Sequence, residues 1–174
     1  MQVGRQFVRG VICYPPPPRV RYVLLDRITR LEPPKFAAGI KCVSLSDDIF
    51  ADHFPGHPIM PGALIIESLA QLCGVLLEQA RRLEGQTDVH ALLTMVDRAR
   101  FRRAVRPGDK LDLAAELLVA REDGGQVKGT ASVDGVVVAS AELGFALAQV
   151  THPVLIARRK EYLDIWLSGS TAES

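Results

Sequence analysis

One segment of the chain carries a histidine and a glutamate in surroundings that suit proton transfer. It runs from Asp52 to Gln71 and reads DHFPGHPIMPGALIIESLAQ. His53 stands at the start of a loop rich in proline and glycine, and rigid loops hold side chains in place for catalysis. Glu67 lies in the apolar run that follows, where burial favours the protonated form of a carboxyl group. His53 is therefore a candidate base near neutral pH, and Glu67 is a candidate acid.

Two further residues complete this candidate site. Gly62 follows Pro61 at the start of a predicted helix, so its backbone N–H lacks an intrahelical acceptor and lies at the positive end of the helix dipole. Such an N–H can bind a thioester carbonyl oxygen as negative charge builds on it. Gln71 lies one helical turn after Glu67 and can hold its carboxyl group by a hydrogen bond. One reaction among several that these residue types would fit is the dehydration of a 3-hydroxyacyl thioester, with His53 removing the α proton and Glu67 protonating the departing hydroxyl.

Other interpretations of the two histidines remain open. A histidine beside a loop of this kind is more often structural than catalytic, and His57 competes with His53 for the role of base. The two together also suggest a metal site. Zinc usually takes three or four ligands, and the intervening prolines prevent an i, i+4 placement on a helix. We therefore expect no metal here, and the dehydration chemistry needs no cofactor.

A long apolar helix is predicted directly after this loop. It covers Ala63–Leu83 and ends before Gly85, with Glu78 and Arg81 expected where it leaves the core for solvent. Because the helix is apolar on nearly every side, it must be wrapped rather than covered on one face. It is also long enough to cross a bilayer, but the carboxyl group of Glu67 within it favours a core helix, so we expect no membrane span.

The remaining regular structure is predicted to be β. Asp134 and Gly135 form a two-residue hairpin signal of the type I′ kind, and Asp123-Gly124-Gly125 reads as another turn. One long helix among five or six long strands predicts an α+β fold, in which a curved antiparallel sheet wraps a single central helix. The expected strands cover residues 36–45, 90–105, 111–120, 127–133 and 136–147.

Length and composition indicate one domain with two appendages. The chain has 174 residues and a net charge of +1, which gives no overall indication of a nucleic-acid or membrane partner. We expect a Pro-rich arm over 1–18, the main domain over 19–147 and an extension over 148–174 with a helix near 154–166 and a frayed tail. Three cysteines without CxxC spacing, Cys13, Cys42 and Cys73, indicate reduced thiols in a cytoplasmic protein.

The segment HFPGHPIMPGALIIESLAQ resembles the active-site signature of the bacterial 3-hydroxyacyl-[acyl-carrier-protein] dehydratases of the FabZ type. The separation of fourteen residues between His53 and Glu67 matches the catalytic pair of that family. The related dehydratase-isomerases carry Asp at the acid position, so Glu67 favours the plain dehydratases. The resemblance extends through VRYVLLDRI, VDRARFRRAVRPGDKLDL and VKGTASVDGVVVASAEL.

The resemblance implies a hot dog fold, a lyase of fatty-acid biosynthesis, a cytoplasmic location and no cofactor. It implies a homodimer, often assembled as a trimer of dimers, with His of one subunit facing Glu of the other. The substrate is attached to acyl carrier protein, whose acidic surface docks on a basic one, although exposed arginines are commonly only solvated. Candidates for that basic surface are Arg98, Arg100, Arg102, Arg103, Arg106 and Lys110.

Some positions depart from the family pattern. Ala91 and Leu92 stand where the family has an aromatic gate to its acyl tunnel, usually Tyr, and Met95 stands where Gly is usual. Asp52 precedes the histidine where Gly is common. Smaller gate residues predict a differently shaped tunnel, and they favour a specialised fatty-acid or polyketide-like pathway over ordinary fatty-acid synthesis.

Two alternative functions fit the same fold. One is thioester hydrolysis, which usually lacks an HFPG-type loop. The other is a non-catalytic paralogue that binds acyl chains or carrier protein, against which the intact His53, Gly62 and Glu67 argue. Apolar residues of the C-terminal extension are expected to pack on the subunit or to meet a partner; they are Leu155, Ile156, Tyr162, Leu163, Ile165 and Trp166.

Overall fold

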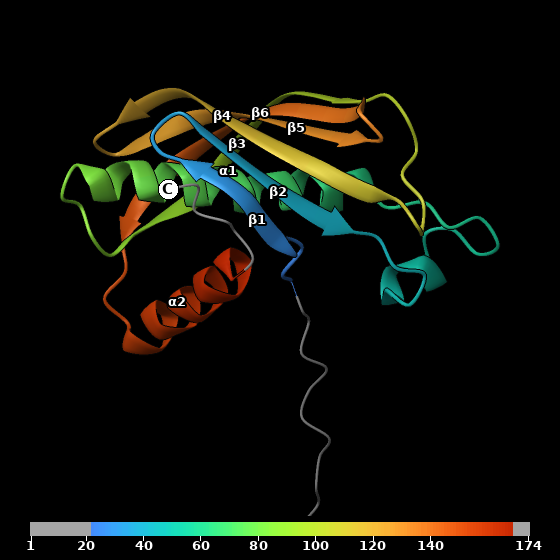
Figure 1. Ribbon diagram of the computed structural model, residues 1–174, viewed down its shortest axis with the longest axis horizontal. Coiled ribbons are helices and arrows are strands. Elements are labelled where there is room, and N and C mark those ends of the chain that lie inside the picture. The colour runs from blue at the N-terminus through green and yellow to red at the C-terminus, as the bar shows by residue number, and fades with distance from the viewer. Residues whose placement is uncertain (1–21, 169–174) are drawn as a thin grey trace, which may run out of the picture.

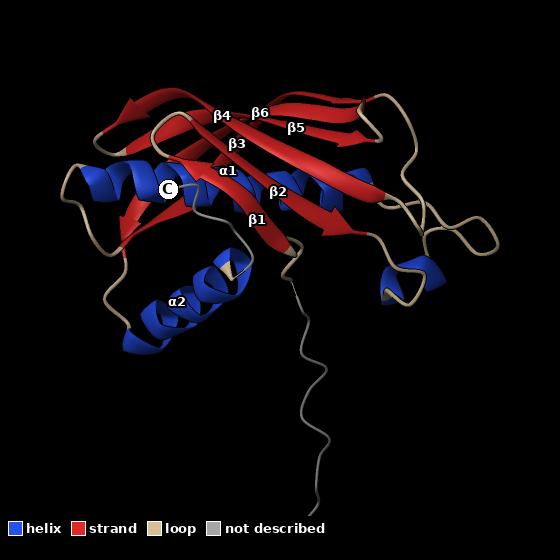
Figure 2. Cartoon of the chain, in the orientation of Figure 1, coloured by secondary structure: helices blue, strands red, loops and turns tan. Residues whose placement is uncertain are grey.

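The computed structural model describes residues 22–168, in which one long helix lies against a curved antiparallel sheet (Figures 1 and 2). The sheet has six strands in the order β1-β2-β4-β5-β6-β3. The expected arm over 1–18 and the tail after residue 168 lie outside the described residues. The elements are β1 (Arg27–Glu32), β2 (Phe36–Cys42), the 3-10 helix η1 (Asp48–Ala51), α1 (Gly62–Leu83), β3 (Val89–Phe101), β4 (Lys110–Arg121), β5 (Gly124–Val133), β6 (Val136–Gln149) and α2 (Pro153–Leu167).

The core lies between α1 and the concave face of the sheet. Leu69, Leu72 and Leu76 of the helix are completely buried, and Leu113 and Leu143 of the strands are buried opposite them. Each such side chain contributes about 1.5–3 kcal/mol by leaving water. By length and composition α1 is apolar enough to cross a membrane, but 72% of its most apolar window is buried inside the fold. The expectation of a wrapped core helix is thus confirmed.

Two predicted turns have different outcomes. The Asp134–Gly135 turn is confirmed, with φ angles of 51° and 77° that suit a type I′ hairpin. The turn predicted at Asp123-Gly124-Gly125 is present but lies slightly earlier, at Glu122 and Asp123, and both glycines belong to β5. A Cβ atom on Gly124 would collide with the carbonyl oxygen of Phe145, and one on Gly125 would lie 2.7 Å from the carbonyl oxygen of Val119. Glycine is needed here because neighbouring strands approach closely, not to reverse the chain.

The end of α1 differs from the sequence expectation. Glu78 and Arg81 are buried, each with 7% of its surface exposed, rather than marking the exit into solvent. Arg81 donates to the side chains of Glu84 and Gln86, while Glu78 meets the start of β3 and α2. Segments distant in sequence cover this last turn, so the helical pattern alone could not reveal its burial.

The helix α2 extends the fold beyond the last strand and lies beneath the C-terminal half of α1 (Figure 1). Trp166 is buried and its indole N–H donates to the carbonyl oxygen of Leu25 at 2.6 Å. Leu163 is buried beside it, whereas Leu155 and Ile165 stay exposed. The extension therefore packs on the rest of the chain through Leu163 and Trp166 and leaves other apolar side chains largely exposed.

Candidate active site

His53 is held by the loop that precedes α1. Its Nδ1 atom lies 2.8 Å from the carbonyl oxygen of Ile59, and the Ile59 N–H donates back to the His53 carbonyl at 3.1 Å. The Phe54 ring stacks on the imidazole with 4.2 Å between the ring centroids. Because a carbonyl oxygen only accepts, Nδ1 must carry the ring proton. This leaves Nε2 as the basic nitrogen, able to take a proton from a substrate.

Gly62 lies in the same cavity as His53. It is the first residue of α1, and its N–H has no acceptor among the described residues, whereas Leu64 and Ile65 both donate to the Pro61 carbonyl. A Cβ atom on Gly62 would lie 2.8 Å from a ring carbon of Phe101. Because Gly62 has no side chain, the Phe101 ring can pack directly against the start of α1. The Gly62 N–H remains without an acceptor among the described residues. The cavity measures about 430 Å³ and is lined by His53, Ile59, Met60, Gly62, Ile65, Phe101, Arg102, Arg103, Ala104 and Val105.

Glu67 is half-buried and is held by a chain of hydrogen bonds. The Gln71 amide nitrogen donates to Glu67 Oε1 at 2.9 Å, as the i, i+4 spacing predicted. Gln71 itself is oriented by the irregular segment that leads into β1, because its oxygen accepts from the N–H groups of Leu24 and Leu25 and its nitrogen donates to the Tyr22 carbonyl. Residues far upstream thus orient the Gln71 amide toward the Glu67 carboxyl group. The spacing of Glu67 and Gln71 in the sequence could not reveal these hydrogen bonds to the upstream backbone.

Glu67 and His53 of the chain lie in different cavities. The cavity beside Glu67 measures about 460 Å³, and no residue lines both it and the cavity of His53. The two candidate catalytic groups of the chain therefore do not face the same space. The residues around Glu67 are Ala70, Gln71, Gly74, Glu78, His90, Ala91, Leu92, Leu93, Phe145, Val150, Leu155 and Arg159.

The three expected gate residues are not all in one place. Ala91 and Leu92 line the cavity of Glu67. Met95 instead lines a separate cavity with Gly144. The pairing of β3 with β6 shifts register between Leu93 and Met95, and a bulge of this kind redirects the side chains after it. Sequence spacing cannot show such a shift.

The second histidine has a different environment. His57 Nε2 accepts a hydrogen bond from the Arg106 guanidinium at 3.0 Å, and His57 lines neither cavity. This contact fixes the loop to the turn before β4, so the geometry favours His53 as the base. Residues 22–168 contain no group of three or more His, Cys, Asp or Glu side chains placed to hold a metal ion.

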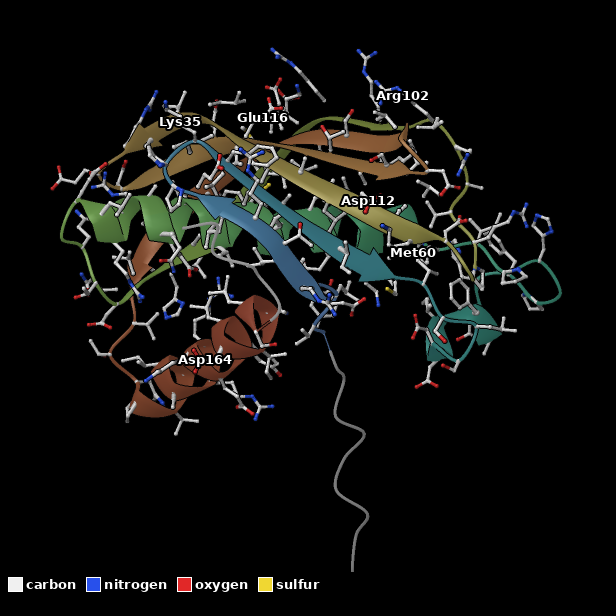
Figure 3. All side chains as sticks on the ribbon, viewed as in Figure 1. Lys35, Met60, Arg102, Asp112, Glu116 and Asp164 are labelled. Carbon is white, nitrogen blue, oxygen red and sulfur yellow. The ribbon has the colours of Figure 1, made fainter. Side chains whose placement is uncertain are left out.

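The candidate basic residues of the docking surface differ in whether other side chains pair with them. Arg102 and Arg103 line the cavity of His53, and Arg102 extends into solvent at the edge of the sheet (Figure 3). Arg98 pairs with Glu142, Arg106 holds His57, and Lys110 pairs with Asp112. Arg100 and Arg103 are exposed and have no partner in the part of the chain that the structure describes.

A buried ionic cluster, which the sequence did not suggest, stands in the cavity of Glu67. Glu78 accepts two hydrogen bonds from Arg159 of α2, at 2.8 and 3.0 Å, and one from the Ala91 N–H at 3.0 Å. His90 Nδ1 lies 3.7 Å from the same carboxyl group. Burial raises the pKa of Glu78, but the interactions with His90, Arg159 and the Ala91 N–H outweigh it and hold the pKa below its usual value.

This cluster predicts a pH-dependent stability. Since the pKa of Glu78 is lowered by folding, its contribution is fully present above the pKa of the unfolded chain, about 4.3, and is lost as the pH falls through the lower folded value. We expect Glu78→Gln to cost about 3 kcal/mol at neutral pH, and this deficit to shrink in acid. Urea unfolding of both proteins across a pH series measures it.

Glu116→Gln is the matched control, because Glu116 is exposed and its pair with Lys128 is a surface pair. Surface pairs contribute little, so this variant should follow the wild type at every pH. A deficit in Glu78→Gln that stays constant into acid would contradict the assignment.

Comparison with known proteins places this geometry in a family. A family model described as a FabA-like domain matches residues 16–142. The 3-hydroxyacyl-[acyl-carrier-protein] dehydratase FabZ of Geobacillus thermodenitrificans is 45% identical over 131 residues, which are 75% of this chain and 88% of the relative. The FabZ of Bacillus subtilis is 42% identical over 133 residues, 76% of this chain and 92% of the relative.

Solved structures agree on the fold. The dehydratase heterocomplex ApeI:P from Xenorhabdus doucetiae matches with a TM-score of 0.62 and 24% identity, covering 78% of this chain and 90% of that one. A hot-dog-like protein from Thermanaerovibrio acidaminovorans matches with a TM-score of 0.56 and 14% identity, covering 75% and 92%. The predicted α+β hot dog fold is confirmed, and the chain belongs to the FabA-like family.

Proposed function

We propose that this chain is a lyase of fatty-acid biosynthesis that dehydrates 3-hydroxyacyl thioesters carried on acyl carrier protein. Family membership and FabZ relatives at 42–45% identity support the reaction. The geometry supports it too, since the reaction needs a histidine oriented through its Nδ1, a helix-opening N–H and a glutamate held by Gln71, and within residues 22–168 neither His53 Nε2 nor the Gly62 N–H has a hydrogen-bond partner. Such an enzyme works in the cytoplasm, where acyl carrier protein is found.

The mechanism follows from the positions of these groups. His53 Nε2 takes the proton α to the thioester carbonyl, while the Gly62 N–H donates to the carbonyl oxygen and stabilises the negative charge that develops there. Glu67 gives its proton to the 3-hydroxyl group, which leaves as water, and a trans-2-enoyl thioester remains. Gln71 holds Glu67 Oε1, so Oε2 is free to carry the transferred proton. Each turnover leaves His53 protonated and Glu67 ionised, and a net proton transfer between them restores the pair.

We propose that the working unit is a homodimer. The observation that supports this is the position of strand β3 at the edge of the sheet, with apolar side chains exposed. Among the strands that the structure describes, β3 is an edge of the sheet and pairs only with β6. A long apolar edge strand is normally covered, because it would otherwise pair with other chains. A second copy of the chain, with β3 beside β3 across a two-fold axis, covers it. The large apolar side chains exposed on β3 are Leu92, Leu93, Met95, Val96 and Phe101.

This pairing also completes the active site. The start of β3 at Leu92 and Leu93 lines the cavity of Glu67, and its end at Phe101 lines the cavity of His53. Antiparallel pairing about a two-fold axis brings the start of one β3 beside the end of the other. The Glu67 cavity of one subunit then meets the His53 cavity of the second. A trimer of such dimers would leave this arrangement unchanged.

The carrier protein is proposed to dock at the rim of the His53 cavity. Arg102 and Arg103 line that cavity, and Arg100 is exposed on the same strand end. Charges of this kind attract an acidic partner and orient its approach. The substrate attached to the carrier would then enter beside Gly62, where its carbonyl oxygen is needed.

The reverse reaction tests the proposed function. The chain is expected to hydrate trans-2-octenoyl thioesters, seen as loss of the enoyl ultraviolet absorbance while free thiol stays at baseline. Carrier-bound and coenzyme A thioesters are assayed side by side, because docking on the basic rim should favour the carrier-bound form. Release of thiol would instead indicate a thioesterase, and an unchanged absorbance with every thioester would contradict the dehydratase.

A further inference from the structure

A groove runs along α1 from Glu67 toward the end of the helix. Glu67, Gln71, Gly74 and Glu78 recur at intervals of three and four residues, so they share one face, and all four line the same cavity. A Cβ atom on Gly74 would already lie 3.5 Å from the Cβ of Ala91, so small residues on both sides keep the groove open. The helical rise places Glu78 about 16 Å along the axis from Glu67.

Residues of the extension that follows the last strand line the far end of this groove. Arg159 of α2 donates twice to Glu78 Oε2, while Oε1 accepts from the Ala91 N–H. Arg159 also lies over the Trp166 ring, 5.5 Å from its centroid, and Trp166 is buried. Leu155, one turn earlier on α2, lines the same cavity. Both residues lie beyond residue 142, where the match to the family model ends.

An alkyl chain cannot easily displace the ion pair between Glu78 and Arg159. The Glu78 side chain is only 8% exposed and both of its oxygens are paired, and breaking a buried ion pair leaves an uncompensated charge at a cost of about 3–5 kcal/mol. Because helical side chains tilt toward the N-terminus, Glu78 also reaches back toward Gly74 and shortens the groove. The acyl part of a hexadecenoyl thioester, extended beyond its C3 atom at Glu67, would need about the whole length of the groove.

We propose that α2, through Arg159 and Leu155, limits the acyl chain to short and medium lengths by capping the groove at Glu78. This inference rests on the proposed function, because it takes the groove beside Glu67 as the acyl site. Octenoyl thioesters end before the ion pair and fit. Hexadecenoyl thioesters reach the pair and are rejected.

The test compares kcat/KM for hydration of trans-2-butenoyl, octenoyl and hexadecenoyl thioesters. Wild type is expected to prefer octenoyl over hexadecenoyl at least about tenfold, a ratio within reach of apolar pocket discrimination. The double variant Glu78→Ala/Arg159→Ala removes both charges together, so neither is left unpaired. It should lose most of this preference, because hexadecenoyl hydration rises relative to octenoyl hydration. Arg158→Ala is the matched control, since it removes an exposed guanidinium from the same helix and should keep the wild-type ratio.

A second variant keeps the proposal testable if the double variant folds poorly. Leu155 is 57% exposed, so Leu155→Trp adds bulk in the groove without disturbing the core. It should lower octenoyl hydration severalfold more than butenoyl hydration. Equal rates for octenoyl and hexadecenoyl in wild type, or ratios unchanged in both variants, would overturn the inference.

Calorimetric binding of saturated acyl-pantetheines separates this inference from the proposed function, because these compounds cannot be dehydrated. A preference for octanoyl over hexadecanoyl that disappears in Glu78→Ala/Arg159→Ala supports the cap even if no hydration is seen, in which case the dehydratase assignment fails alone. Hydration with equal binding of both lengths overturns the cap and leaves the dehydratase standing.

Discussion

Glu67→Gln is expected to lower the hydration and dehydration rates at least a hundredfold while the fold stays intact. A positioned acid contributes about 10²–10⁴ to the rate, and a glutamine has no proton of comparable acidity to give. The new side chain has the same size, and its amide oxygen can still accept from the Gln71 nitrogen that now binds Glu67 Oε1. The loss should therefore appear in kcat rather than in stability. Steady-state rates and thermal unfolding, measured on the same preparation, separate the two effects.

The exposed Glu116 supplies the control for this variant. Glu116→Gln makes the same chemical change on the surface of β4, far from either cavity lining, and should keep the wild-type rate. A Glu67→Gln protein that dehydrates at the wild-type rate would show that another group is the proton donor.

The second large effect is a recovery of activity on mixing two inactive variants. His53→Ala and Glu67→Gln homodimers should each be inactive. If His53 of one subunit works with Glu67 of the other, a mixed dimer has one site that carries both changes and one site that is intact. Co-expression with random pairing makes half of the dimers mixed, so activity should return to about one quarter of the wild-type value per subunit.

A subunit-internal site predicts the opposite result, because every site in the mixed dimer would then carry one inactivating change. Co-expression without recovered activity, in a preparation shown to contain mixed dimers, would thus refute the shared site. His57→Gln serves as the control for the histidine, since His57 lines neither cavity. This variant should dehydrate at close to the wild-type rate, and mixing should not change it.

The chain-length cap and the shared site place the two halves of the substrate in different surroundings. The thioester is expected to meet the helix start and the basic rim of one subunit, and the acyl chain the groove of the other. Ala91 and Leu92 are smaller than an aromatic gate, which predicted an altered tunnel. Arg159 of α2 lines the same cavity as Ala91, so we expect α2 to contribute to the altered shape as well.

Local patterns in the sequence determined much of the fold and of the candidate site. Pro61 and Gly62 mark the start of α1 because a helix start tolerates a missing N–H, and Asp134-Gly135 marks its hairpin because both residues adopt positive φ. The hydrogen bond from Gln71 to Glu67 follows from one helical turn of spacing. These features depend only on neighbours in the chain, so the sequence is sufficient to find them.

Tertiary structure alone decided the features that depend on distant segments. Glu78 is buried because Arg159, far along the chain, covers it, and Met95 turns away from the gate because β3 shifts register against β6. The carbonyl of Ile59 sets which nitrogen of His53 is basic. Likewise the separation of His53 and Glu67 into two cavities appears only once the sheet has curled around α1, since their spacing in the sequence does not show which space each side chain faces.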